Sequence, residues 1–251
     1  KYAKAISKSI IPDLLKYLLD DHVRLSQIHA KFNKKYLKYK RKFILDTMKT
    51  PRPIGNIESL RDWHTDWPHD PWGGGANKNT NVGCVKEPFP DVLMSLTLIW
   101  YLSDIKKNGG TIVLPKSHKF GSSPRSKKIP LYEPIKNELQ VTGSPGSVLI
   151  QDSRLWHSPS NDTPQSSNRI AIVNRWSPWW MSVNDYAYNS ITNIICRPMN
   201  YREYKKIPNN LKLFIQHLCP EIEENIQRPI ILRSKKSIEK VKKIIKKIKS
   251  Q

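Results

Sequence analysis

The stretch that decides the fold runs from residue 143 to residue 176 and reads GSPGSVLIQDSRLWHSPSNDTPQSSNRIAIVNRW. It contains two runs of strand-forming residues, Gly146–Ile150 and Arg169–Trp176. Turn residues precede each run, at Gly143–Gly146 and at Asn161–Pro164. Short Val- and Ile-rich runs bounded by such turns are typical of antiparallel strands, whereas parallel strands need longer crossovers. The stretch therefore predicts an antiparallel sheet.

The same pattern of short strand-forming runs between turn residues extends toward the N-terminus. Leu93–Leu102 and Thr111–Leu114 are two further strand-forming runs, separated by a loop around Asn108-Gly109-Gly110. All eight tryptophans lie between residues 63 and 180. Because aromatic side chains bury large areas, this window should contain the core and any binding pocket.

Helices are predicted on both sides of this window. The first fifty residues have helical spacing, with a helix beginning near Asp13, and a later helix begins near Asn210. We therefore expect one domain over residues 1–251. Its parts are an N-terminal helical layer (1–61), a barrel with the active site (62–180), a C-terminal helical region (181–232) and a basic amphipathic tail (233–251).

The positive charge is concentrated at the two ends of the chain. The formal net charge is +22. Residues 1–61 hold 15 basic and 5 acidic side chains, and residues 233–251 hold 9 basic and 1 acidic side chain. The middle of the chain is nearly balanced. We interpret most of this charge as solvated lysine and regard nucleic acid as an unlikely partner. The tail helix is expected to pack on its own domain; the alternative is a basic helix for a membrane surface or a partner helix.

Cysteine usage and hydropathy exclude other classes of protein. The three cysteines, at 84, 196 and 219, are far apart and form no C-x-x-C pair, which excludes a disulfide scaffold and favours a reducing, cytoplasmic location. The longest apolar stretch, Val92–Leu102, is about half the roughly 20 residues that a membrane span needs. We therefore expect no transmembrane segment.

Candidate metal ligands lie in Asp62–Asp70. On an extended strand, His64 and Asp66 point to the same side because they are two residues apart. His157 follows the Gly146–Ile150 strand and is the natural third ligand. Two histidines and one carboxylate leave three positions of an octahedral metal open, which suits non-haem iron and oxygen chemistry. Taken alone, His-x-Asp is a weak signal, and a surface loop is the usual explanation.

Arg169 is a candidate anchor for a dicarboxylate. Strand alternation places it on one face with Ala171 and Val173, whose small side chains leave room in a barrel interior. An arginine fork binds a carboxylate through two hydrogen bonds. The alternative is a surface ion pair, for example with Asp162.

Three blocks of sequence match a known family. They are Trp63–Asp66, Asn108–Lys119 and Gly146–Arg169. Together they resemble the phytanoyl-CoA dioxygenase family of Fe(II)- and 2-oxoglutarate-dependent oxygenases. The middle block is similar to the N-G-G … P-G-S-H-K signature of that family, with Lys116 in place of the usual glycine.

The resemblance implies a mainly β fold with flanking helices (α+β): a double-stranded β-helix, which is a jelly-roll or cupin-like barrel. It assigns His64, Asp66 and His157 to Fe(II), and Arg169 to the distal carboxylate of 2-oxoglutarate. It also implies the reaction, in which O₂ and 2-oxoglutarate are converted to succinate and CO₂ while a substrate C–H bond is hydroxylated. Because the metal carboxylate Asp66 is present, hydroxylation is favoured over halogenation.

Less specific predictions concern the rest of the pocket. Thr111 and Ser160 are candidates for hydrogen bonds to 2-oxoglutarate, and Trp67 and Trp72 for a substrate wall. We expect a small or carrier-linked organic substrate, and the basic surroundings favour an anionic one. His69 and Asp70 (a second ligand set on a less favoured reading) are expected to line the entrance. The competing functions are a catalytically silent jelly-roll binding protein and a nucleic-acid-directed oxygenase or binder.

Overall fold

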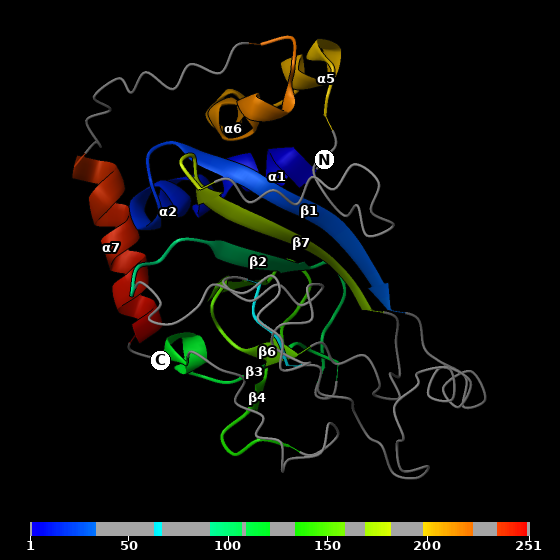
Figure 1. The fold of residues 1–251 in the computed structure, drawn as a ribbon, viewed down its shortest axis with the longest axis vertical. Coiled ribbons are helices and arrows are strands. Elements are labelled where there is room, and N and C mark those ends of the chain that lie inside the picture. The colour runs from blue at the N-terminus through cyan, green and yellow to red at the C-terminus, as the bar shows by residue number, and fades with distance from the viewer. Residues whose placement is uncertain are drawn as a thin grey trace. The chain divides into compact units, whose positions relative to one another are not determined.

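A computed structural model describes residues 2–33, 63–66, 91–106, 109–120, 134–158, 169–181, 198–222 and 235–249. Within these ranges, seven strands form two sheets (Figure 1). The first sheet has the order β1-β7-β2-β5 and the second β4-β3-β6. The strands are β1 (Val23–Asn33), β2 (Leu96–Tyr101), β3 (Ile112–Val113), β4 (Leu139–Gln140), β5 (Val148–Asp152), β6 (His157–Ser158) and β7 (Arg169–Pro178).

The order in which the chain visits the two sheets defines the fold. It enters the second sheet at β3 and β4, returns to the first at β5, crosses to the second at β6 and ends in the first at β7. β3 pairs antiparallel with β4 and with β6. Alternation between two antiparallel sheets is the jelly-roll arrangement of a double-stranded β-helix. The predicted fold class, mainly β with flanking helices, is confirmed.

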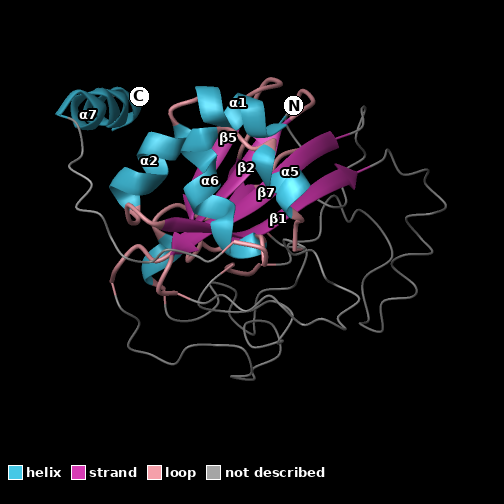
Figure 2. Cartoon of the chain, turned by 90° about the horizontal axis from the view of Figure 1, so that it is seen from above, coloured by secondary structure: helices cyan, strands magenta, loops and turns pink. Residues whose placement is uncertain are grey.

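The chain divides into two compact units, one of which comprises residues 1–28, 93–96 and 174–251. Its helices are α1 (Tyr2–Lys8), α2 (Ile11–Leu18), α5 (Tyr201–Lys205), α6 (Asn209–Ile215), the 3-10 turn η2 (Gln216–Leu218) and α7 (Lys235–Lys249). Figure 2 shows helices beside β1 and β7. Trp176 of β7 meets Phe214 of α6 edge-on, with ring centroids 5.8 Å apart. The side chain of Asn174 hydrogen-bonds Tyr2 and Trp176.

The tail forms the predicted amphipathic helix. α7 packs against α2, and its Val241 is only 1% exposed. α5 begins at a capping box, in which Asn200 and Glu203 exchange hydrogen bonds between side chain and backbone. Among the described residues, none of the helices is long and apolar enough to cross a bilayer.

The prediction of helix through residue 50 is wrong for residues 23–33, which form strand β1. Helix α2 ends at Leu18, and the Asp20 side chain then accepts a hydrogen bond from the His22 backbone N–H, which closes a turn. Val23 and Leu25 are buried and alternate with more exposed residues. This alternation with a period of two is typical of a strand. It was missed because the helical spacing of the neighbouring α2 is the stronger pattern.

The second unit, residues 29–92 and 97–173, holds the second sheet and, among its described residues, two hydrophobic clusters. One cluster joins Ile99, Tyr101, Ile105 and Ala171, with Leu149 and Val173 packed against it. Ile99 and Tyr101 of β2, and Ala171 and Val173 of β7, are spaced two apart, so they lie on one face of their strands, the inner face. The other cluster joins Trp63, Ile112, Leu114 and Trp156.

A bulge at Gly146 sets the register of β2 and β5. Gly146 donates to the Tyr101 carbonyl, and the Tyr101 N–H donates to the Ser147 carbonyl. Gly146 has φ 92, a conformation that glycine adopts without the steric cost of a side chain. Counting back along the antiparallel pair places Ile99 opposite Leu149 and Thr97 opposite Gln151.

Gly110 is required by close packing. A Cβ atom there would lie 1.5 Å from the Val141 carbonyl oxygen, whereas one at Gly109 would lie 3.4 Å from its nearest neighbour. We expect Gly110→Ala to lower the free energy of unfolding by about 3 kcal/mol or more, because backbone must move. Gly109→Ala is the matched control and should cost under about 1 kcal/mol. Urea unfolding measures both, and equal losses would contradict this packing.

Candidate active site

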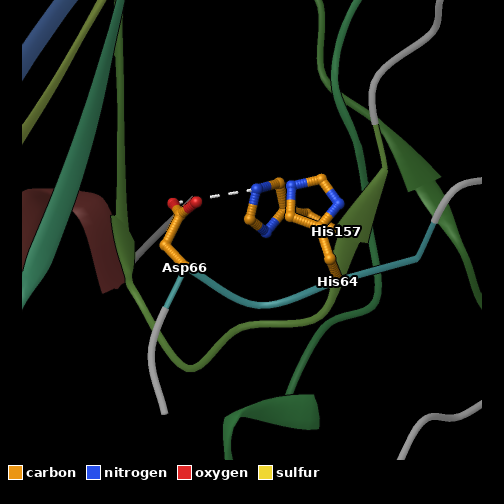
Figure 3. Close-up of side chains that lie close together, drawn as sticks. All are labelled: His64, Asp66 and His157. Atoms are coloured by element: carbon orange, nitrogen blue, oxygen red, sulfur yellow. Dashed lines mark ion pairs between the residues drawn. The ribbon is translucent and has the colours of Figure 1, made fainter. Parts of the chain in front are cut away.

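The three predicted metal ligands lie together in the second unit. The backbones of His64 and His157 exchange two hydrogen bonds of 2.9 Å each, and the Asp66 N–H donates to the Ser153 carbonyl at 2.8 Å. These bonds hold two distant segments side by side. One ligand atom from each of His64, Asp66 and His157 lies within 4.8 Å of the other two. Figure 3 shows the Asp66 carboxylate facing both imidazole rings.

His157 is prepared to act as a neutral ligand. Its Nδ1 lies 2.9 Å from the Leu155 carbonyl, to which it donates, so Nε2 keeps its lone pair. Burial, together with the nearby His64, lowers the pKa of His157 to about 4. At pH 7 the ring is therefore uncharged. The contact of 3.8 Å between His157 Nε2 and Asp66 Oδ2, dashed in Figure 3, then joins a neutral ring to a carboxylate.

The Asp66 carboxylate is oriented by a buried hydroxyl pair. Thr97 Oγ1 donates to Asp66 Oδ2 at 2.6 Å and lies 2.9 Å from Ser153 Oγ. Thr97 and Ser153 are at most 2% exposed. The sequence analysis did not assign a role to either residue. The available signal was a hydroxyl residue inside the apolar run Leu93–Leu102.

We expect Thr97→Val to weaken metal binding about tenfold, because hydrogen bonds to a ligating carboxylate hold it in place. The variant keeps the shape of the side chain and removes only the hydroxyl. Titration with Mn(II), a redox-stable divalent ion, measures the effect. Thr111→Val is the matched control, because Thr111 contacts Arg169 and none of the three ligands. Equal affinities of the two variants would show that Thr97 does not support Asp66.

The donor set fits one divalent metal ion. Two imidazoles and one carboxylate are the ligands of non-haem iron sites with open coordination positions. One imidazole is held in a single tautomer by a backbone carbonyl, and the carboxylate is held by a hydroxyl. Both kinds of support are usual around metal ligands. The residues present therefore fit the ion that the sequence resemblance implies.

Arg169 provides a buried positive charge on the inner face. Its side chain donates to the Gly109 carbonyl at 3.0 Å and to Thr111 Oγ1 at 3.2 Å, and its guanidinium carbon lies 6.0 Å from the centroid of the Tyr101 ring. Burial lowers the pKa of Arg169 from its usual value. Arg169 is only 6% exposed, so it is not a surface side chain; Asp162, the partner in the alternative ion pair, lies outside the described residues.

Several predicted residues lie outside the described part of the chain. These are the 2-oxoglutarate candidate Ser160, the substrate-wall candidates Trp67 and Trp72, the entrance residues His69 and Asp70, and Asp162. Lys116, where the family signature has glycine, has φ 68, in the left-handed region that favours glycine. The substitution thus keeps a glycine-like backbone.

The family model for phytanoyl-CoA dioxygenase (PhyH) matches residues 13–170, which is more than half of the chain. The chain belongs to the phytanoyl-CoA dioxygenase family. The enzymes of this family are Fe(II)- and 2-oxoglutarate-dependent oxygenases. The matched range includes all three candidate ligands and also Arg169. A sequence search of curated proteins gave no match.

Solved structures similar to this member of the phytanoyl-CoA dioxygenase family include HygX from Streptomyces hygroscopicus with nickel and 2-oxoglutarate bound. It is 14% identical, with a TM-score of 0.44 over 72% of this chain and 68% of that chain. EctD from S. alaskensis with 2-oxoglutarate and 5-hydroxyectoine is 18% identical, with a TM-score of 0.40 over 70% of this chain and 51% of that one. The chain thus spans about half the length of EctD.

Proposed function

We propose that this protein hydroxylates a small or carrier-linked organic molecule in a reaction that depends on Fe(II) and 2-oxoglutarate. The observation that carries the proposal is the convergence of His64, Asp66 and His157 in a chain of the phytanoyl-CoA dioxygenase family. In the balanced reaction, the substrate C–H bond, O₂ and 2-oxoglutarate give an alcohol, succinate and CO₂. One oxygen atom enters the alcohol and the other enters succinate.

His64, Asp66 and His157 would hold the iron. Bound iron would supply the activation of O₂, with 2-oxoglutarate as the two-electron reductant. The protein contributes position and polarity. The Leu155 carbonyl fixes the His157 tautomer, and the Thr97 hydroxyl fixes the Asp66 carboxylate. These contacts fix two of the three donor groups, so those two need little reorganisation when the ion binds.

Arg169 would bind the distal carboxylate of 2-oxoglutarate. Its guanidinium is steadied by the Gly109 carbonyl and by Thr111, and the side chain is buried. A charge-assisted hydrogen bond is stronger in such a setting than in water. Ile99, Leu149 and Val173 on the same face would exclude water from the reaction, since they are apolar and packed together.

The test is an anaerobic titration of the full chain with Fe(II) and then 2-oxoglutarate, followed in visible light for a charge-transfer band. Exposure to O₂ should then release succinate, quantified by mass spectrometry, even without the substrate because such enzymes turn over slowly when uncoupled. A band that needs both components, with succinate formed after O₂, supports the proposal. Binding without succinate would indicate a catalytically silent binding protein, and no binding would refute the proposal.

A further inference from the structure

Gln151 is a buried polar side chain that the proposed function does not use. It lies on β5 and is 4% exposed. Within the described part of the chain, neither its Oε1 nor its Nε2 has a hydrogen-bond partner. Most buried polar side-chain atoms in folded proteins are hydrogen-bonded, so two such atoms on one side chain call for an explanation. A ligand that supplies both missing bonds is one.

The register of the first sheet places Gln151 beside the candidate metal site. Gln151 is two residues from Leu149, so both side chains lie on the inner face. It stands opposite Thr97, and directly opposite residues of an antiparallel pair have Cβ atoms about 5 Å apart. The Thr97 hydroxyl is itself 2.6 Å from Asp66 Oδ2. Gln151 is thus separated from the Asp66 carboxylate, the candidate metal ligand, by the side chain of Thr97.

Gln151 and Arg169 lie at opposite ends of this inner face. The Arg169 guanidinium is over the Tyr101 ring, at the end of β2 away from Thr97. Ile99 and Leu149 form an apolar layer between the two ends. A co-substrate anchored at Arg169 reaches the metal from the Tyr101 end. Gln151 is at the opposite end, next to Thr97 and Asp66, which leaves this part of the face for the primary substrate.

The chemistry of an amide restricts what Gln151 can bind. The side chain offers an acceptor, Oε1, and a donor, Nε2. A carboxylate or phosphate accepts only and would leave Oε1 without a bond, and an ammonium group donates only and would leave Nε2 without one. A neutral amide or hydroxyl both donates and accepts, so one such group can satisfy both atoms.

We propose that Gln151 is a specificity-determining residue, which hydrogen-bonds a neutral amide or hydroxyl group of the substrate close to the carbon that is oxidised. This inference rests on the proposed function, and it narrows the substrate class. An anionic part of the substrate, which the basic composition favours, binds away from this face. The end of the molecule that enters the site is uncharged.

The first test is a change in stability without any ligand. Gln151→Leu replaces the amide with an apolar group of similar size, so it removes two unsatisfied atoms. We expect the melting temperature of the full chain to rise by about 2–6 °C. Asn174→Leu is the matched control, since the Asn174 amide is also buried but hydrogen-bonds Tyr2 and Trp176, and it should lower the melting temperature. A fall for Gln151→Leu would mean that Gln151 is a structural residue and would overturn the inference.

The second test measures selectivity with small probes. Propionamide, benzamide and nicotinamide are compared with propionate, benzoate and nicotinate on the full chain, loaded with Mn(II) and saturating 2-oxoglutarate. Ligand-observed NMR gives the affinities. We expect at least one amide to bind about tenfold more tightly than its carboxylate, and Gln151→Leu to reduce that ratio to about twofold or less. No preference for any amide, or an unchanged ratio in the variant, would overturn the inference.

The two proposals fail separately. If the wild-type chain binds neither the metal nor 2-oxoglutarate, the proposed function is wrong. If it binds both but the amide preference is absent, only the role of Gln151 is wrong. The melting temperature of Gln151→Leu does not depend on either ligand.

Discussion

Asp66→Ala should lower the affinity for Fe(II) about 1,000-fold and abolish succinate formation. Asp66 is the only carboxylate among the three clustered ligands of the described residues, so its loss removes one of three bonds and all of the negative charge. Apparent binding free energies of four-ligand zinc sites are about 10–16 kcal/mol, or about 2.5–4 kcal/mol per ligand, which corresponds to about two to three orders of magnitude. The loss of the charge places Asp66→Ala at the upper end of this range.

Metal analysis after gel filtration measures the bound iron of this variant, and mass spectrometry measures succinate. Asp104→Ala is the control, because Asp104 is an exposed carboxylate whose partner, Lys106, lies 3.9 Å away at the surface. The control should bind iron as the wild type does. Normal iron content in Asp66→Ala would show that the ligand assignment is wrong, and folding is checked by the far-UV circular dichroism of both variants.

Arg169→Leu should lower the affinity for 2-oxoglutarate at least about 100-fold. A charged hydrogen bond is worth about 1.5–3 kcal/mol, and a guanidinium can give two to one carboxylate. Arg169→Lys keeps the charge but loses the planar fork, so its affinity should fall by about tenfold. The anaerobic charge-transfer band, titrated with 2-oxoglutarate, gives both values.

Substitution of Arg169 should change the affinity for the co-substrate 2-oxoglutarate and leave the affinity for Fe(II) unchanged. In the structure the guanidinium donates to the Gly109 carbonyl and to Thr111 and lies 6.0 Å from the Tyr101 ring, and these residues are not among the three ligands. Fe(II) affinity should therefore stay within about twofold of the wild type. If Arg169→Leu lost iron and 2-oxoglutarate together, a general disruption of the barrel would explain the result better than the loss of a carboxylate anchor.

Local sequence patterns predicted the fold well where one pattern dominated. The runs that became β2, β5 and β7 have Val, Ile and Leu between strong turn residues, and the tail that became α7 has apolar residues at helical spacing. β1 was mistaken for helix because its alternation covers few residues and follows α2 directly. Its strand conformation comes from pairing with β7, more than a hundred residues away, which local propensity does not register.

The candidate site shows the same limit. His64, Asp66, His157 and Arg169 stood out because their chemistry and spacing match a family, and the structure brings the first three together; their roles stay predictions. Thr97 and Gln151 do not belong to any residue pattern that singled them out in the sequence. Their importance comes from one register, fixed by a bulge at Gly146, that puts them opposite each other. The sequence lists the side chains, but the pairing register of β2 with β5 decides which of them are in contact.

The paired backbones of His64 and His157 have a consequence for folding kinetics. These residues are ninety-three positions apart in the chain, so their contact requires closure of a long loop, which is entropically costly and slow. An ion that joins the two segments can bind only after that closure. Such an ion slows the opening of the finished barrel far more than it speeds its assembly.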